Sequence, residues 1–372
     1  MKKKIIVLAG TRPEAIKLAP VILELKKRPD LFETVICASG QHDEMFYQAL
    51  ADFDIIPDTD LKVMRPGQSL AGVTARLFEA IDPFLEREHP DWVLVQGDTT
   101  TAMVGALCSF YRKVKVGHVE AGLRSHLRCA PFPEEVNRRV VGVVADKHFA
   151  PTVGAAQNLL KEGVTDADIL VTGNTVVDAL LWIAERVRKQ QPPLPNNVLE
   201  ALSTGKRMVL VTGHRRESFG SGFEQICLAI LALAKMHQDV VFVYPVHLNP
   251  NVRQPVMRLL GKDERVLLID PLTYKPFVWL MDRSTLILTD SGGIQEEAPS
   301  LGKLVLVMRE VTERPEGVES GTSLLVGSDR NQIVESVTSV LNRLNESRVI
   351  PLPSNPYGDG LAAPRIVQAL SS

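Results

Sequence analysis

LILTDSGGIQEEAP, residues 286–299, joins a short apolar run to a glycine-rich turn and the start of a helix. The apolar run 286–288 has the length of a parallel strand that is covered on both faces. Ser291, Gly292 and Gly293 follow it and supply a hydroxyl group and a backbone without bulky side chains. The first N–H groups of a helix have no partner within the helix and attract anions. The stretch therefore predicts a phosphate-binding site at the carboxyl end of a buried strand.

Glu297 lies about one helical turn beyond Gly293. A carboxylate at this position can accept hydrogen bonds from the hydroxyl groups of a ribose. The alternative is a glycine-rich turn that only reverses the direction of the chain. Taken alone, the stretch leaves both interpretations open.

The bulk composition excludes several classes of partner. The chain has 372 residues, of which 45% are hydrophobic and 23% are charged, as in an ordinary globular protein. A formal net charge of −2 supplies no general attraction for nucleic acid or for an anionic membrane. No apolar run approaches the ~18 residues of a membrane span. We therefore expect a small-molecule partner, with no nucleic acid and no membrane.

The four cysteines lie far apart in the sequence and form no CxxC pair, which argues against a zinc site and against a disulfide framework. They favour a reducing compartment, so we expect a cytoplasmic protein. HExxH and EF-hand patterns are absent, and so is the GxGxxG fingerprint of nicotinamide enzymes. We expect no metal and no cofactor.

Short Val/Ile-rich runs alternate with amphipathic segments, which is typical of βα units around a parallel sheet. The strands are predicted at residues 5–9, 35–38, 92–96, 114–119, 148–150, 208–211, 240–244, 266–269, 286–288 and 304–307. Residues 175–188 and 361–370 have helical patterns. The fold is therefore predicted to be α/β.

The length predicts roughly two to three domains, and the alternation favours two doubly wound ones. We predict an N-terminal domain of residues 1–172 plus 358–372 and a C-terminal domain of residues 173–357. Ligands of open α/β sheets bind outside the carboxyl ends of the strands. The active site is therefore expected in a cleft between the two domains.

Two cations follow the first predicted strand. Thr11 and Glu14 have the spacing of a capping box, so a helix is expected to begin here. Arg12 and Lys17 lie beside this helix start. They are either solvated charges, or they face the phosphate site of the other domain and clamp a diphosphate.

Three carboxylates follow the next predicted strands. Asp98 ends the segment GD after residues 92–96, Glu120 ends the segment HVE, and Glu134 begins the helix that follows FP. Asp98 is equally explained as a helix N-cap, and Glu134 as a favourable charge near a helix dipole. Three carboxylates at one sheet edge nevertheless exceed what capping requires, and they indicate proton transfer.

In the predicted C-terminal domain, His214 and Arg215 follow the strand 208–211, and His247 follows the strand 240–244. These side chains either line the cleft or lie in ordinary surface turns. Arg314, in TERPEG, is a candidate for the phosphate or base side of a ligand, although arginines in loops are often only solvated.

Ten motifs in order resemble the non-hydrolysing UDP-N-acetylglucosamine 2-epimerases of bacteria. They are GTRPEAIK, GDTTT, HVEAGLR, PEE, VTGHRRE, PVHLNP, PFVWLM, TDSGGIQEEAPSLGKLVL, TERPE and NPYGDG. The resemblance implies two Rossmann-like domains of the glycosyltransferase-B type that face a cleft, and a homodimer. It also implies interconversion of UDP-GlcNAc and UDP-ManNAc without an added redox cofactor, for the synthesis of cell-surface polysaccharide.

The resemblance also implies roles for individual residues. The UDP part would be held by Arg12, Lys17, Ser291, Gly292, Gly293, Glu297 and Arg314, with Phe277 near the base and Leu272 contributing its backbone. The reacting sugar would lie among Asp98, Glu120, Glu134 and His214. A second UDP-GlcNAc, acting as an allosteric activator, would involve Gln41, Arg215 and His247.

The proton on carbon 2 of the sugar is only weakly acidic, so direct deprotonation is implausible. Elimination of UDP to 2-acetamidoglucal and re-addition on the opposite face is the family mechanism, and it needs acid/base groups on two sides. A UDP-sugar-dependent glycosyltransferase and a hydrolysing 2-epimerase of the same fold are alternatives. A catalytically silent sugar-nucleotide sensor is a third, although it has no use for the carboxylates.

Overall fold

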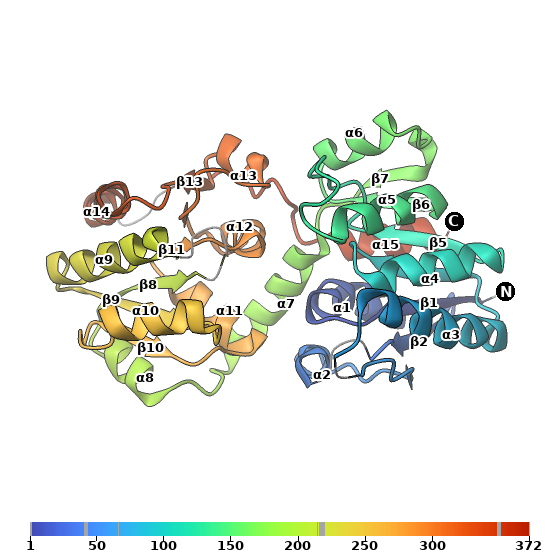
Figure 1. Ribbon diagram of the computed structural model, residues 1–372, viewed down its shortest axis with the longest axis horizontal. Helices are drawn as coiled ribbons and strands as arrows, with labels where there is room; N and C mark the ends of the chain where they lie inside the picture. The colour runs from blue at the N-terminus through green and yellow to red at the C-terminus, as the bar shows by residue number, and fades with distance from the viewer. Residues whose placement is uncertain are drawn as a thin grey trace. The chain divides into compact units, whose positions relative to one another are not determined.

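The computed structural model describes residues 2–40, 44–65, 67–213, 215, 220–347 and 351–371. The chain divides into two compact units, and each contains one sheet enclosed by helices (Figure 1). Unit 1 comprises residues 1–182 and 357–372, and unit 2 comprises residues 183–356. Helix α7 (Thr175–Lys189) crosses the division between them.

Unit 1 contains a seven-stranded parallel sheet with the order β3-β2-β1-β4-β5-β6-β7. Its strands are β1 (Lys3–Ala9), β2 (Phe32–Ala38), β3 (Thr59–Asp60), β4 (Trp92–Gln96), β5 (Lys115–Val119), β6 (Lys147–Ala150) and β7 (Ile169–Val171). Its helices, apart from α7, are α1 (Arg12–Lys26), α2 (Glu44–Ala51), α3 (Leu70–Glu88), α4 (Thr100–Tyr111), α5 (Glu134–Val144), α6 (Val153–Lys161), the 3-10 helix η1 (Asp166–Asp168) and α15 (Ala362–Ser371).

Unit 2 contains a six-stranded parallel sheet with the order β10-β9-β8-β11-β12-β13. Its strands are β8 (Arg207–Thr212), β9 (Val240–Pro245), β10 (Val266–Ile269), β11 (Leu286–Thr289), β12 (Val305–Val307) and β13 (Ser323–Leu325). Its helices are α8 (Asn196–Ser203), α9 (Ser221–Met236), α10 (Pro250–Leu260), α11 (Tyr274–Arg283), α12 (Gly292–Glu297), the 3-10 helix η3 (Ala298–Leu301), α13 (Pro315–Glu319) and α14 (Arg330–Ser347).

Both sheets are doubly wound, as the sequence predicts. In unit 1 the strand order reverses between β1 and β4, and in unit 2 it reverses between β8 and β11. Crossovers between parallel strands are right-handed, so helices that lead in opposite directions from the reversal cover opposite faces of the sheet. At the reversal the two neighbouring loops separate and leave room for a ligand at the carboxyl ends of the strands. The motifs GTRPE and GDTTT in unit 1 and DSGG in unit 2 follow these central strands.

The central strands are buried because their side chains are apolar on both faces. All five residues of β4 and all four of β11 are buried, and Leu286, Ile287 and Leu288 are 0% exposed. This confirms the strand predicted from the apolar run 286–288. The predicted strands at 92–96 and 266–269 have the same bounds as β4 and β10.

The C-terminal helix returns to unit 1. The predicted helical segment 361–370 is α15, which packs against α1. Its first N–H groups have no partners within the helix, and Asp178 of α7 accepts hydrogen bonds from Ala362 N at 3.2 Å and Ala363 N at 2.9 Å. Within the described part of the chain, no helix is long and apolar enough to cross a membrane.

Candidate active site

The first βα turn is held by a buried carboxylate. Glu14 is 0% exposed, and its Oε2 accepts hydrogen bonds from Gly10 N at 3.0 Å and Thr11 N at 2.7 Å. This is the reach-back half of the predicted capping box. The other carboxylate oxygen of Glu14 accepts the Thr99 hydroxyl at 2.7 Å, and Thr99 also caps α4 by accepting Ala102 N. Glu14 therefore joins the loop that follows β1 to the loop that follows β4.

Burial raises the pKa of Glu14 from 4.5 to about 7, although the hydrogen bonds from Gly10, Thr11 and Thr99 oppose the shift. The folded protein thus binds more protons than the unfolded chain between these values, so the stability contributed by protonation is lost as the pH rises through this window. The difference in pKa corresponds to about 3 kcal/mol. We expect Glu14→Gln to remove this pH dependence from the urea-unfolding free energy between about pH 4.5 and pH 7. If the unfolding free energies of the wild type and the variant change with pH in the same way, this prediction is wrong.

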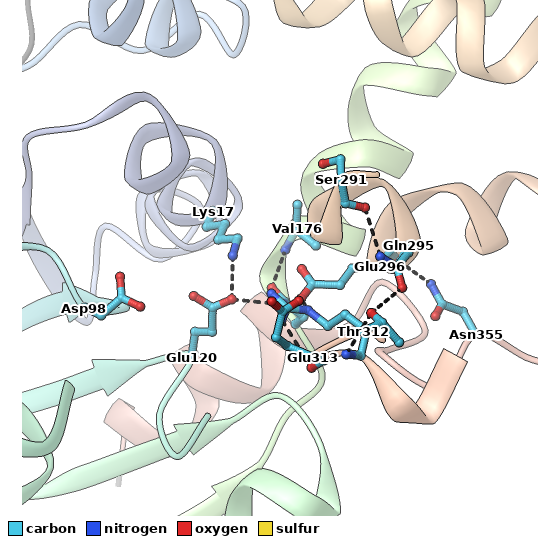
Figure 2. A network of polar contacts seen from close by, with 12 residues as sticks. Lys17, Asp98, Glu120, Val176, Ser291, Gln295, Glu296, Thr312, Glu313 and Asn355 are labelled. Atoms are coloured by element: carbon cyan, nitrogen blue, oxygen red, sulfur yellow. Dashed lines mark hydrogen bonds and ion pairs between the residues drawn. The ribbon is translucent and has the colours of Figure 1, made fainter. Parts of the chain in front are cut away.

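Lys17 and Glu120 form an ion pair at the same sheet edge (Figure 2). Lys17 lies on α1, and Glu120 follows β5 directly. The Glu120 side chain is 5% exposed, and its backbone φ of +63° is in the left-handed region that non-glycine residues rarely adopt. Gln96, the last residue of β4, donates its side-chain amide to the second carboxylate oxygen of Glu120. The strained backbone and these donors fix the direction in which the carboxylate points.

Arg138 joins Glu120 to Asp98. One terminal nitrogen donates to the backbone oxygen of Glu120 at 2.7 Å, and the other donates to Asp98 Oδ2. Asp98 is a quarter exposed, whereas Arg138 is 9% exposed. Asn137, beside Arg138 on α5, donates to the backbone oxygen of Asp98 at 2.9 Å. The sequence analysis missed Arg138, although its position one helical turn after Glu134 was a usable signal.

Glu134 begins α5, the helix that carries Arg138, and one of its carboxylate oxygens is buried without a hydrogen-bond partner among the described residues. Arg12 is the first residue of α1 and is half-buried. His118 is fully buried behind the site; its Nε2 lies 2.8 Å from the Gly97 oxygen, and burial lowers its pKa to about 3. It is therefore a neutral part of the scaffold.

In unit 2 the loop after β11 lies beside two guanidinium groups. A methyl group added at Gly292 would lie 3.6 Å from Arg314 Cζ and 3.7 Å from a terminal nitrogen of Arg215. Asp290 is 0% exposed, and its Oδ2 accepts the backbone N–H of Arg215 at 2.8 Å. The predicted phosphate site thus lies beside two positively charged side chains.

Arg314 is paired with a buried acid. Its Nε donates to Glu296, whose side chain is 1% exposed. Thr312 donates its hydroxyl to the amide oxygen of Gln295 at 2.7 Å, and Gln295 donates in turn to the backbone oxygen of Ser291 at 3.2 Å. These contacts attach the 312–314 segment to α12.

The predicted ribose ligand, Glu297, is buried at the end of α12. The hydroxyl of Tyr274, the first residue of α11, donates to Glu297 Oε1 at 2.6 Å. Leu272, just before α11, and Phe277 on α11 are both half-buried. Tyr274 is a second residue that the sequence analysis did not identify.

His247 is exposed after β9, and its Nδ1 accepts the backbone N–H of Asn249 at 3.1 Å. His214 and Gln41 lie outside the described residues. Among the residues that the structure does describe, no group of three or more His, Cys, Asp or Glu side chains could hold a metal ion.

Comparison with known proteins shows which family the chain resembles. The family model described as UDP-N-acetylglucosamine 2-epimerase matches residues 23–371. The UDP-N-acetylglucosamine 2-epimerase of Escherichia coli (strain K12) is 54% identical over 372 residues, which cover 99% of this chain and 98% of the relative.

Two solved structures share the fold over almost their whole length. The Neisseria meningitidis UDP-GlcNAc 2-epimerase bound to UDP-GlcNAc is 46% identical, with a TM-score of 0.87 and 99% of each chain covered. The S. aureus MnaA–UDP structure is 42% identical, with a TM-score of 0.85, and the match covers 99% of this chain and 96% of that one.

Proposed function

This chain is an enzyme that belongs to the UDP-N-acetylglucosamine 2-epimerase family, and on that premise we propose that it inverts carbon 2 without hydrolysing the nucleotide sugar. The reaction is the reversible interconversion of UDP-GlcNAc and UDP-ManNAc. UDP leaves to give 2-acetamidoglucal and then adds back, while a proton returns to the opposite face of carbon 2.

Elimination is the favoured route because no carbonyl group is attached to carbon 2. The electron pair left by direct loss of the proton would have no acceptor. When the diphosphate departs from carbon 1 with the electrons of the C–O bond, the electron pair of the C–H bond can form a double bond between carbons 1 and 2. Cations and N–H donors beside the diphosphate stabilise the charge that grows on the leaving group.

The observation that carries this proposal is the cluster of Lys17, Glu120, Arg138 and Asp98 at the sheet reversal of unit 1. It contains two carboxylates in different surroundings, one buried against a lysine and the other a quarter exposed beside an arginine. Such differences separate the roles of acid and base. Asp98, Glu120 and Glu134 share the proton transfers in this proposal, and His214 supports the leaving group.

Unit 2 would bind UDP. Arg314 and Arg215 lie beside Gly292, so the diphosphate is proposed to lie over the start of α12. Ser291 and Gly293 supply further donors, Glu297 accepts the ribose hydroxyls, and Phe277 and Leu272 flank the base. Arg12 and Lys17 would supply cations from unit 1. The nucleotide sugar bound by the N. meningitidis relative supports this choice of ligand.

Heavy water provides the test. We expect UDP-GlcNAc incubated with the protein in deuterated buffer to yield a manno-configured nucleotide sugar with deuterium at carbon 2. Release of free N-acetylmannosamine with UDP would instead identify the hydrolysing reaction. Transfer of the sugar only when an acceptor is added would identify a glycosyltransferase. Binding of UDP-GlcNAc without deuterium exchange at carbon 2 would indicate a sugar-nucleotide sensor and refute the proposal.

The family resemblance also leads us to propose a cytoplasmic homodimer that serves cell-surface polysaccharide synthesis. A second UDP-GlcNAc is proposed to act as an activator through Gln41, Arg215 and His247. Arg215 lies beside Gly292, so activator and substrate would share this part of the surface. Sigmoidal dependence of the initial rate on UDP-GlcNAc would support an activator, and a hyperbolic dependence would contradict it.

A further inference from the structure

Asn174 lies where the chain leaves unit 1. It follows β7, is 1% exposed, and precedes α7, the helix that carries the chain into unit 2. Its backbone N–H donates to Tyr357 O at 2.7 Å, and Tyr357 is the first residue of the segment that returns to unit 1. The two backbones approach closely here: a Cβ added at Gly173 would lie only 3.2 Å from Gly358 Cα.

Both ends of the Asn174 side chain are engaged. The amide oxygen accepts the backbone N–H of Val176 at 3.1 Å, in the first turn of α7. The amide nitrogen donates to Glu120 Oε1 at 3.2 Å. An N–H group on one side and a carboxylate on the other allow only this orientation of the amide. One side chain therefore connects the start of α7 to the buried carboxylate.

Glu120 has donors from three separate elements of unit 1. Lys17 comes from α1, Gln96 from β4, and Asn174 from the segment that begins α7. Lys17 and Gln96 belong to the sheet edge itself. Asn174 is attached to α7, so a shift of this helix would move a donor of the carboxylate.

We propose that Asn174 is a positioning residue that ties the Glu120 carboxylate to the N-terminus of α7. The orientation of the proton-transferring group then follows the helix that leads to the UDP-binding unit. Proton transfer needs a donor and an acceptor within about 3 Å, and a misplacement of ~1 Å can cost about 100-fold in rate. This inference rests on the proposed epimerase function.

Two substitutions separate the contact to Glu120 from the helix cap. Asn174→Asp keeps an oxygen for the Val176 N–H but turns the donor into a carboxylate that faces Glu120. Asn174→Ser keeps a capping hydroxyl that is too short to reach Glu120. We expect both variants to lower kcat for carbon-2 exchange by about 10- to 100-fold, with Asp the stronger. KM for UDP-GlcNAc and Kd for UDP stay within about twofold of the wild type.

Asp329→Ala is the control for loss of a helix cap. The Asp329 side chain accepts the N–H groups of Asn331 and Gln332 at the start of α14, in the unit that does not contain Glu120. We expect this variant to unfold at lower urea concentration and to keep the wild-type kcat. A fall in its kcat similar to that of Asn174→Ser would overturn the inference, because destabilisation at any helix start would then explain the effect.

A stability cycle tests the contact directly. In Asn174→Asp/Glu120→Gln the new amide at position 120 can donate to the new carboxylate at position 174, so the double variant should unfold at a higher urea midpoint than Asn174→Asp alone. If the urea midpoint of the double variant shifts by the sum of the shifts in the two single variants, the two side chains do not interact and the contact is refuted. Unchanged kcat in both Asn174 variants refutes the positioning role if the wild type exchanges carbon 2. A wild type without exchange refutes the proposed function instead.

Discussion

Glu120→Gln is expected to lower the rate of carbon-2 deuterium exchange by about 10²- to 10⁴-fold, the usual contribution of a positioned acid/base group. The amide keeps the size of the side chain but cannot take up a proton. It also leaves the half-buried Lys17 without its carboxylate partner. Exchange is measured by NMR in heavy water at saturating UDP-GlcNAc. UDP affinity, measured by calorimetry, should change much less than exchange, because most of the proposed UDP contacts lie in unit 2.

Glu162→Gln is a matched control. Glu162 also pairs with a cation in unit 1, where it accepts two hydrogen bonds from Arg124, but it lies at the end of α6 and is a third exposed. Its replacement should lower the urea midpoint, because the Arg124 side chain is 0% exposed and loses a carboxylate partner, but it should leave exchange within about twofold of the wild type. If Glu120→Gln and Glu162→Gln exchange at the same rate, Glu120 takes no part in proton transfer. Asp98→Asn is expected to behave like Glu120→Gln.

Arg314→Ala is expected to have two effects of different origin. Loss of a charge-assisted contact to the diphosphate should weaken UDP binding by about 10- to 100-fold, which corresponds to 1.5–3 kcal/mol. Loss of the contact to Glu296, whose side chain is 1% exposed, should also destabilise unit 2, because a buried carboxylate then loses this cation. Calorimetric titration with UDP and urea unfolding measure the two effects.

A second substitution separates them. In Arg314→Ala/Glu296→Gln the buried charge is removed together with its partner, so most of the stability should return. The affinity for UDP should stay low, since the cation is still missing. Recovery of both quantities in the double variant would mean that Arg314 supports the fold and does not bind the diphosphate. Arg314→Lys keeps the positive charge and should lose less affinity than Arg314→Ala.

Most of the sheet could be predicted from the sequence because buried parallel strands are apolar on both faces. The runs 92–96 and 266–269 coincide with β4 and β10, and 286–288 lies within β11. The strands β3, β7 and β13 were not predicted. They have only two or three residues each, and each is an edge strand of its sheet, so they carry little apolar signal.

The candidate site was predictable where a residue follows a strand directly. Asp98 and Glu120 follow β4 and β5, and parallel strands bring their carboxyl ends to one edge. Arg138, Gln96 and Asn174 were missed because their importance depends on which carboxylate each one reaches, and nothing in local spacing gives that information. Hydrogen bonds to Asp98 or Glu120 across 24 to 54 residues of sequence identify them.

Hydrophobic periodicity and glycine-rich turns act over a few residues, so the amino-acid pattern was enough to predict the fold class and the candidate residues at the strand ends. Which side chains meet depends on the assembled fold. The pairing of Lys17 with Glu120, the Arg138 bridge to Asp98 and the contact of Asn174 with both Glu120 and α7 depend on strand order and on the path of the chain between the units. Such contacts form only when the whole sheet is assembled, since each joins segments that are remote in the chain.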